Sequence, residues 1–298
     1  MMKRSPAQYH CHDFDFNCHV ESLKASHLLE HLPEIVPLDD DDEVRLRKDI
    51  AESSASVEEG EKASWNQFFQ HHSTGQIYKP RRYILPEFNH YLSLPHIHCL
   101  VEVGCGYGCT MLPILQALVP GCASLRYIAT DYSREALTIL EANPACQSFS
   151  THIVTAQWDI ASSSFPAITL PDPISPDLIL CIFTLSAVPP SQHLQTLFHL
   201  KQLLTPPRTD ERKKYLLFRD YGVYDFSMLE KHVIRHEEFF FRRLDGTICY
   251  YFSLEYLQKL AEEAGFEVLE LSYATVINHN RKTGEKLHRV FVHAVLAV

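Results

Sequence analysis

The sequence predicts a single α/β domain built on a doubly wound, seven-stranded, mostly parallel sheet. From Cys99 onward, short apolar segments alternate with helix-like segments, the order that places helices on both faces of such a sheet. The segment Asp177–Phe183 is apolar throughout its middle, as expected of a central strand buried on both faces. A glycine-rich loop follows the first apolar segment. We therefore expect a ligand site at the carboxyl ends of the strands.

The individual elements follow from local patterns. We expect strands over residues 99–103, 125–130, 152–156, 177–183, 215–218, 266–273 and 289–298. Helices are expected over residues 110–119, 133–142, 191–204 and 253–264. Ser133 and Ser253 are typical N-caps, and Gly265 is a typical helix stop. Because two strands follow the last helix, the C-terminal edge of the sheet is predicted to be antiparallel.

Composition separates an N-terminal extension from this domain. The 298 residues are 46% hydrophobic and 21% charged, as in ordinary globular proteins. Residues 1–60 include Asp39–Glu43 and a Ser/Glu-rich stretch, so we expect a disordered or weakly ordered tail there and a folded domain over residues 61–298. Within the tail, Leu28, Leu29 and Leu32 suggest a short helix before Pro33. No apolar run is long enough to span a membrane.

Cysteine and charge content bound the environment and the partners. The nine cysteines form no C-x-x-C pair, which favours reduced thiols and a cytoplasmic protein, with the nucleus as an alternative. His10, Cys11 and His12 stand in an unpatterned segment, and no metal site is predicted. The formal net charge of −10 argues against nucleic-acid binding unless basic residues gather on one face.

Three acidic residues accompany the glycine loop. Gly104, Gly106 and Gly108 follow a strand that carries Glu102. Asp131 ends the second strand, and Asp159, followed by Ile160, comes after the third. Each carboxylate alone is equally well explained as a helix cap or loop acid. The loop alone leaves dinucleotide cofactors open. At successive strand ends, however, the set favours S-adenosylmethionine, since Asp131 suits the ribose hydroxyls and Asp159 and Ile160 the adenine.

Several blocks in order resemble the tRNA 3-methylcytidine methyltransferases of the methyltransferase-like group. The resemblance covers residues 65–298 and is carried by Trp65–Phe69, Tyr78–Tyr83 with Glu87–Phe88, Glu102–Gly108, Ile182–Pro190, Leu217–Asp225, Arg243–Thr247 with Tyr251–Phe252, and Arg289–Phe291. The block Leu217–Asp225, close to the family's L-F-R-D-Y-G-x-Y-D, is the most specific. Phe69, Pro80 and Tyr83 stand where the family usually has tyrosine, an acid and tryptophan.

The resemblance implies a Rossmann-like class I methyltransferase that methylates cytosine N3 at position 32 of the tRNA anticodon loop. In that family a seryl-tRNA synthetase or another adaptor can deliver the tRNA, so the resemblance makes such a protein a candidate partner. By the resemblance and the loop pattern together, the cofactor would be held by Trp65, Phe69, Gly104, Gly106, Asp131, Asp159, Ile160 and Ile182.

The reaction suggests roles for further residues. Asp220 is hypothesised to accept a hydrogen bond from the exocyclic amine of cytosine, with Arg219 and Tyr221 beside it; alternatively, Arg219 and Asp220 pair with each other. Expected substrate contacts are Lys79, Arg81, Arg82, Tyr224, Arg242 and Arg243. Two rival functions stay open: a methyltransferase of the same fold acting on a protein or small molecule, and an inactive methyltransferase-like interaction subunit.

Overall fold

The expected sheet is present in a computed structural model, which describes residues 11–35, 65–72, 79–161, 176–205, 212–229, 233–243, 245–280 and 283–298. Its seven strands run in the order β3-β2-β1-β4-β5-β10-β9. They are β1 (Cys99–Val103), β2 (Arg126–Asp131), β3 (Ile153–Gln157), β4 (Leu178–Ile182), β5 (Tyr215–Tyr221), β9 (Glu267–His279) and β10 (Lys286–Ala297). The first five are parallel, and β10 is antiparallel to both β5 and β9, which confirms the antiparallel C-terminal edge.

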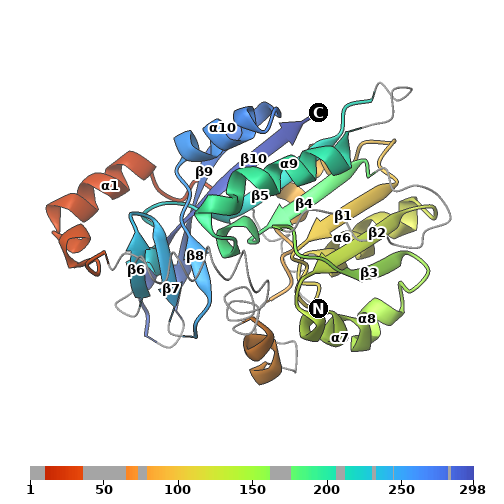
Figure 1. Ribbon diagram of the computed structural model, residues 1–298, viewed down its shortest axis with the longest axis horizontal. Coiled ribbons are helices and arrows are strands. Elements are labelled where there is room, and N and C mark those ends of the chain that lie inside the picture. The colour runs from red at the N-terminus through yellow and green to blue at the C-terminus, as the bar shows by residue number, and fades with distance from the viewer. Residues whose placement is uncertain are drawn as a thin grey trace, which may run out of the picture.

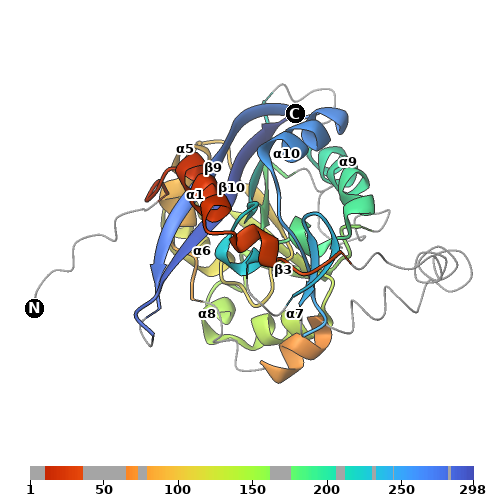
Figure 2. The ribbon, with the colours of Figure 1, turned by 90° about the vertical axis from the view of Figure 1, so that its left-hand side faces the viewer.

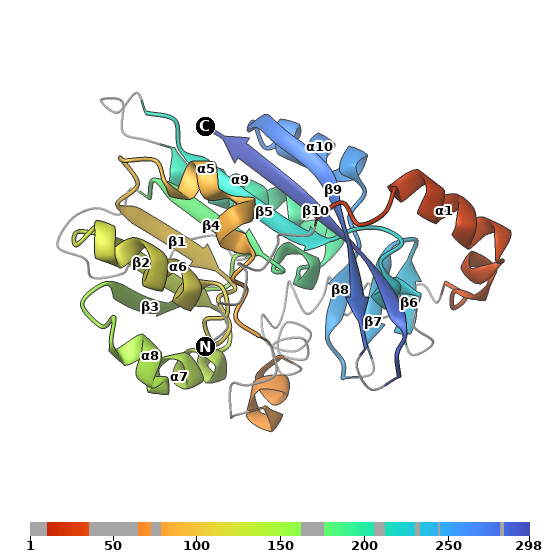
Figure 3. The same cartoon turned by 180° about the vertical axis from the view of Figure 1, so that it is seen from behind.

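Helices cover both faces of this sheet. One face carries α9 (His193–Leu204) and α10 (Leu254–Glu263), as Figure 1 shows. The other carries α5 (Asn89–Leu92) and α6 (Met111–Leu118), seen from behind in Figure 3. Further helices are α4 (Ile84–Glu87), α7 (Arg134–Ala142), α8 (Pro144–Gln147) and the helical residues 65–71. Short 3-10 turns are η2 (Val119–Gly121), η3 (Leu185–Ala187), η4 (Pro190–Gln192) and η5 (Phe226–Met228).

The central strands are apolar throughout because successive residues enter opposite cores. On β4, Ile179 and Cys181 pack in the core beneath α9, whereas Leu178 and Leu180 pack beneath α6. All four side chains are fully buried. This explains why the fourth strand reads as an unbroken apolar run rather than an alternating one.

Two strands are longer than predicted because of tertiary pairing. The prediction ended the fifth strand at Phe218, but β5 continues through Tyr221, which pairs with Phe291 of β10. Likewise β9 continues to His279 along β10. The extension places Arg219 and Asp220 inside a strand rather than after it.

The segment between β5 and α10 forms a second sheet that was not predicted. Its strands are β6 (Val233–Glu237), β7 (Phe240–Arg243) and β8 (Ile248–Tyr250), all antiparallel. Asp245-Gly246 lies between β7 and β8, and Gly246 has a φ of 82°. An Asp-Gly pair is a strong hairpin signal, so the sequence did contain evidence for this turn.

The N-terminal extension requires a correction. Residues 1–60 were expected to be a disordered or weakly ordered tail with a short helix near Leu28, and η1 (Leu28–His31) lies at that position. The helix α1 (Phe16–Ala25) was not expected. The amide of Asp13 donates to the Thr275 carbonyl of β9 at 2.9 Å. Phe16 stacks on Tyr273 with ring centroids 3.9 Å apart. Main-chain bonding to β9 therefore anchors this segment beside the β9–β10 ribbon (Figure 2).

Several earlier expectations lie outside the described residues. They concern His10, Tyr78, residues 36–60 and the domain boundary at residue 61. Within the described part of the chain, no helix has the length and apolar character needed to cross a membrane.

Candidate active site

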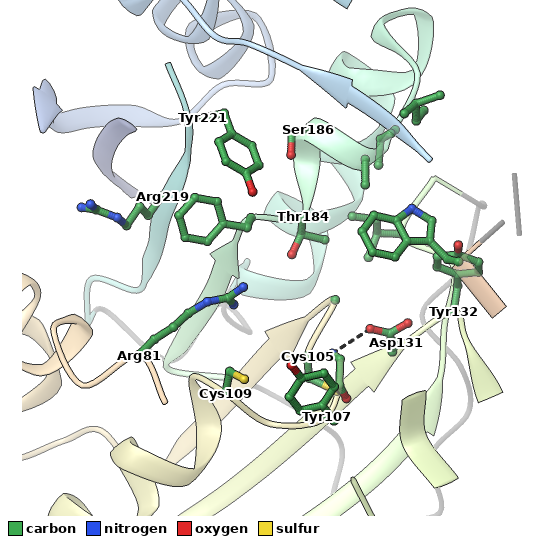
Figure 4. Close-up of a pocket in the computed structure, with 18 of the residues that line it drawn as sticks. Arg81, Cys105, Tyr107, Cys109, Asp131, Tyr132, Thr184, Ser186, Arg219 and Tyr221 are labelled. Carbon is green, nitrogen blue, oxygen red and sulfur yellow. Dashed lines mark hydrogen bonds between the residues drawn. The ribbon is translucent and has the colours of Figure 1, made fainter. Parts of the chain in front are cut away.

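A cavity of about 750 Å³ opens at the carboxyl ends of the parallel strands. Acidic and basic residues line different parts of it, which we call the acidic end, around Asp131, and the cationic end, around Arg81 and Arg219. Asp131 and Asp159 are the only carboxylates among the described residues that line it. Five cationic residues line it as well: Lys79, Arg81, Arg219, Arg243 and Arg289. Figure 4 shows Asp131 and Tyr132 on one side of Thr184 and Arg81 and Arg219 on the other.

The acidic end is built by the glycine loop. Gly104 and Gly106 have φ values of 62° and 52°, which side chains other than glycine rarely adopt. The Asp131 carboxylate accepts from the Gly106 amide at 2.8 Å and the Ser133 amide at 2.9 Å, one bond on each oxygen. Each oxygen keeps a further lone pair, so the carboxylate retains acceptor capacity for ligand hydroxyls.

Glu102 does not line the cavity. It is fully buried beneath the glycine loop and accepts a 2.8 Å hydrogen bond from the Tyr127 hydroxyl. Burial raises the pKa of Glu102 to about 7, against smaller opposing effects that include this hydrogen bond. The acid on the first strand therefore supports the loop from below rather than offering charge to a ligand.

Other expected cofactor residues surround the same end. Asp159 and Ile160 line the cavity, as do Trp65 and Phe69 from the helical residues 65–71. A Cβ built on Gly106 would lie 3.6 Å from the Phe69 ring, so the aromatic side chain faces the loop. Ile182 is an exception: it is buried in the core beneath α6 and does not line the cavity.

These residues fit S-adenosylmethionine. The loop leaves its backbone open, Asp131 offers oxygen lone pairs at the end of β2, and Ile160 offers an apolar surface beside Asp159. This is where open α/β sheets bind nucleotide-like ligands.

Asp220 is sealed inside the protein. Its Oδ2 accepts from the amides of Thr184 at 3.1 Å and Ser186 at 2.9 Å, and its Oδ1 accepts from the Tyr221 amide at 2.9 Å. The side chain is fully buried and does not line the cavity. Burial raises the pKa of Asp220 to about 6. The expected contact with a substrate amine is not consistent with this geometry, because the fully buried carboxylate does not reach the cavity.

Arg219 does not pair with Asp220. Consecutive residues of β5 point to opposite faces, and Arg219 forms an ion pair with Glu87 instead. Its guanidinium lies between the rings of Tyr83 and Phe291, 5.0 and 4.6 Å from their centroids. In Figure 4 it is directed away from Thr184. The alternative of an Arg219–Asp220 pair is therefore wrong.

The expected substrate residues separate into two groups. Lys79, Arg81 and Arg243 line the cavity, and Tyr221, proposed above for catalysis, lines it too. Three others do not line it: Arg82, Arg242 and Tyr224. Tyr224 contacts Phe16 of α1, and its carbonyl lies 3.1 Å from His19 Nε2. Arg242 Nε lies 3.3 Å from His236 Nε2.

Sequence reasoning missed three residues of the cationic end. Phe183 follows β4 with a φ of 57° and lies 4.9 Å below the Arg81 guanidinium. Phe291 and Arg289 come from β10, and the Arg289 guanidinium lies 5.2 Å from the Phe291 centroid. Asp225 partly neutralises Arg289, since its Oδ2 accepts from Arg289 Nε at 2.9 Å. The position of Phe183 directly after a central strand was the available signal.

Cofactor affinity should depend on pH through Asp131. Burial raises its pKa to about 6, so the ionised form that accepts both amides prevails only above that value. We expect the affinity for S-adenosylhomocysteine to fall about tenfold per pH unit below 6 and to level off above it. Calorimetry between pH 5 and 8 measures this. Asp131→Asn is the control and should bind weakly with no such inflection; an identical inflection in that variant would assign the titration to another group.

Comparison with known proteins agrees with the fold and with the expected cofactor. A family described as a methyltransferase domain matches residues 54–271. The 1,6-didemethyltoxoflavin-N1-methyltransferase of Burkholderia thailandensis, crystallised with S-adenosylhomocysteine, superposes with a TM-score of 0.52 at 14% identity, covering 82% of this chain and 90% of that one. Fold, site and family match define an S-adenosylmethionine-dependent class I methyltransferase.

Curated relatives narrow the class. The tRNA N(3)-methylcytidine methyltransferase trm140 of Schizosaccharomyces pombe is 31% identical over 237 residues, 77% of this chain and 72% of that protein. The tRNA N(3)-cytidine methyltransferase METTL6 of Mus musculus is 29% identical over 266 residues, 86% of this chain and 89% of that protein. The chain belongs to the tRNA N3-methylcytidine methyltransferase family.

Proposed function

We propose that the protein transfers the methyl group of S-adenosylmethionine to N3 of a cytidine in tRNA, at position 32 of the anticodon loop. The observation that carries the proposal is the charge division of the cavity. At the end away from Asp131, the guanidinium groups of Arg81, Arg219, Arg243 and Arg289 lie beside the rings of Tyr83, Phe183, Tyr221 and Phe291. Aromatic rings on which a base can stack, together with cations, suit a nucleobase with its phosphates. The names of the relatives add the atom that is methylated.

The chemistry asks for alignment rather than for a base. Bound S-adenosylmethionine supplies a methyl group on a positively charged sulfur. Cytosine N3 carries an unshared pair at neutral pH, so it attacks the methyl carbon as the carbon–sulfur bond breaks and its electrons pass to sulfur. No proton moves. The residues of the cavity therefore act by orienting the base and excluding water. Because N3 is occupied in a duplex, the cytidine must be unpaired, as in a loop.

Individual residues take defined roles in this proposal. Asp131 accepts hydrogen bonds from the ribose hydroxyls of the cofactor, and Asp159 and Ile160 contact its adenine. The backbone of Gly104 and Gly106 contacts its methionine end. Trp65 and Phe69 cover it. Lys79, Arg81 and Arg243 contact phosphates, and Tyr221 contacts the base.

Each of the two rival functions is tested by its own assay. Purified protein is incubated with methyl-labelled cofactor and either total tRNA or protein extract. We expect label in tRNA; label in protein alone would favour a protein methyltransferase. Calorimetry with S-adenosylhomocysteine tests the inactive subunit, which predicts no binding.

A seryl-tRNA synthetase or other adaptor is the remaining partner in the proposal. It is supported if bare transcript is a poor substrate and a cell fraction restores activity. Full activity of the purified chain alone would remove it.

Neighbouring arginines on β7 offer a matched test of the cationic end. Arg243 lines the cavity, with its guanidinium 5.5 Å from the Tyr221 centroid, whereas Arg242 does not line it. We expect Arg243→Met to raise the KM for tRNA about tenfold and to reduce the salt dependence of binding by about one counterion. Arg242→Met should stay close to wild type. Equal effects of the two substitutions would contradict the assignment of Arg243 to substrate binding.

A further inference from the structure

The turn after β4, residues 183–187, lies between the two ends of the cavity. Phe183, Thr184 and Ser186 all line the cavity, and η3 follows within the same turn. A Cβ built on Gly104 would lie 2.4 Å from Thr184 Cγ2, so this turn also touches the glycine loop. The conformation of this turn therefore sets the distance between the glycine loop and the rings of the cationic end.

This turn is held in an unfavourable backbone conformation. Phe183 has a φ of 57°, in the left-handed region that residues with a Cβ rarely adopt. Such a conformation persists only where surrounding contacts enforce it. Here the Phe183 amide donates to the Arg219 carbonyl at 2.7 Å, and the Thr184 hydroxyl donates to the Val103 carbonyl at 3.0 Å.

The remaining restraint comes from Asp220. One oxygen, Oδ2, accepts the amides of Thr184 and Ser186 together, and Oδ1 accepts the amide of Tyr221. Through these bonds the carboxylate joins the backbone next to Phe183, in the turn, to the backbone of Tyr221, in β5. The rings of Phe183 and Tyr221 lie with their centroids 5.0 Å apart. Removing the carboxylate would release both amides of the turn at once.

We propose that Asp220 is a positioning residue: its buried carboxylate fixes the turn after β4 so that Phe183 forms the wall against which the methyl-accepting base packs. The identity of that base rests on the proposed function above. Asp220 touches neither substrate nor cofactor and acts through Phe183. It thereby sets the position and angle of the base relative to the methyl group, and a misplacement of about 1 Å can lower the rate about 100-fold.

The test compares Asp220→Asn with a matched control, Asp177→Asn. Asp177 is also a buried carboxylate that accepts two backbone amides, those of His98 and Cys99 at 2.8 and 2.9 Å, but it precedes β4 at the opposite end of the sheet. We expect Asp220→Asn to lower kcat about 100-fold while retaining S-adenosylhomocysteine binding. Hydrogen exchange at the Thr184 and Ser186 amides should rise about tenfold. Asp177→Asn should leave kcat and these amides unchanged.

A double-mutant cycle with Phe183→Gly separates positioning from direct contact, because glycine adopts a positive φ without strain and removes the ring. In that background Asp220→Asn should cost little further kcat. A full further 100-fold loss, or lost kcat without faster amide exchange, would overturn the proposal. If Asp220→Asn does not fold, Phe183→Gly alone tests the proposal. A lower kcat with normal S-adenosylhomocysteine binding supports the proposal, and a wild-type kcat overturns it. Exchange and cofactor binding require no tRNA, so they judge the turn even if another acceptor proves to be the substrate.

Discussion

Gly104→Ala is expected to lower the affinity for S-adenosylhomocysteine by about 100-fold or more, equivalent to about 2.8 kcal/mol. The added methyl would meet Thr184 Cγ2 at 2.4 Å and Thr184 Oγ1 at 2.5 Å, on a residue with a φ of 62°. The Thr184 side chain cannot simply rotate away, since its hydroxyl donates to the Val103 carbonyl at 3.0 Å. Backbone strain adds about 1–2 kcal/mol. The loop must therefore shift away from the bound cofactor.

Gly121→Ala is the control for this substitution. Gly121 ends η2, and a Cβ built on it meets no atom within 4 Å. Calorimetry and thermal melting should find it close to wild type. Wild-type cofactor affinity in Gly104→Ala would contradict the role given to the loop.

Glu87→Ala is expected to destabilise the protein by about 3–5 kcal/mol, because it removes the carboxylate from a buried arginine. Glu87 and Arg219 side chains are 1% and 3% exposed. The same Oε1 lies 3.0 Å from His293 Nδ1, and His293 Nε2 lies 2.9 Å from Glu270. Burial alone would raise the pKa of Glu87, but Arg219 and His293 bring it below its ordinary value. Chemical denaturation measures the loss.

A surface pair provides the comparison for Glu87. Lys213 and Glu267 are 2.6 Å apart, with side chains 53% and 60% exposed. Glu267→Ala should cost no more than about 1 kcal/mol, since solvent screens exposed ion pairs. A Glu87→Ala protein as stable as Glu267→Ala would show that the buried network contributes little.

The parallel core and the acidic end of the site were predictable because their signals are local. A strand followed by glycines, with Asp131 and Asp159 after the next two strands, predicts that these residues line one cavity once the strands are parallel, as they do. Tertiary pairing was not predictable in this way. Arg219 and Asp220 were expected beyond a strand end, where both would face a ligand; pairing with β10 keeps them within β5 and sends them to opposite faces.

The cationic end depends on contacts between distant segments. Glu87, Arg219 and His293 come from three separate parts of the chain, and no periodicity links them. The left-handed Phe183 is imposed by amide bonds to β5. The N-terminal helix was missed although Asp15 is a typical N-cap residue, and it accepts from the Cys18 amide at 2.8 Å. The acidic run Asp39–Glu43 and the Ser/Glu-rich stretch after it led us to expect a tail over all of residues 1–60.

The most direct test of the proposed activity is nucleoside mass spectrometry of tRNA from cells that lack the protein. We expect 3-methylcytidine to fall, wild-type protein to restore it, and Asp131→Ala, which lacks the carboxylate of the cofactor end, to fail. Measuring tRNA made in the cell allows any adaptor to act. Unchanged 3-methylcytidine across the tRNA of those cells, or equal restoration by Asp131→Ala, would contradict a cofactor-dependent tRNA cytidine methyltransferase.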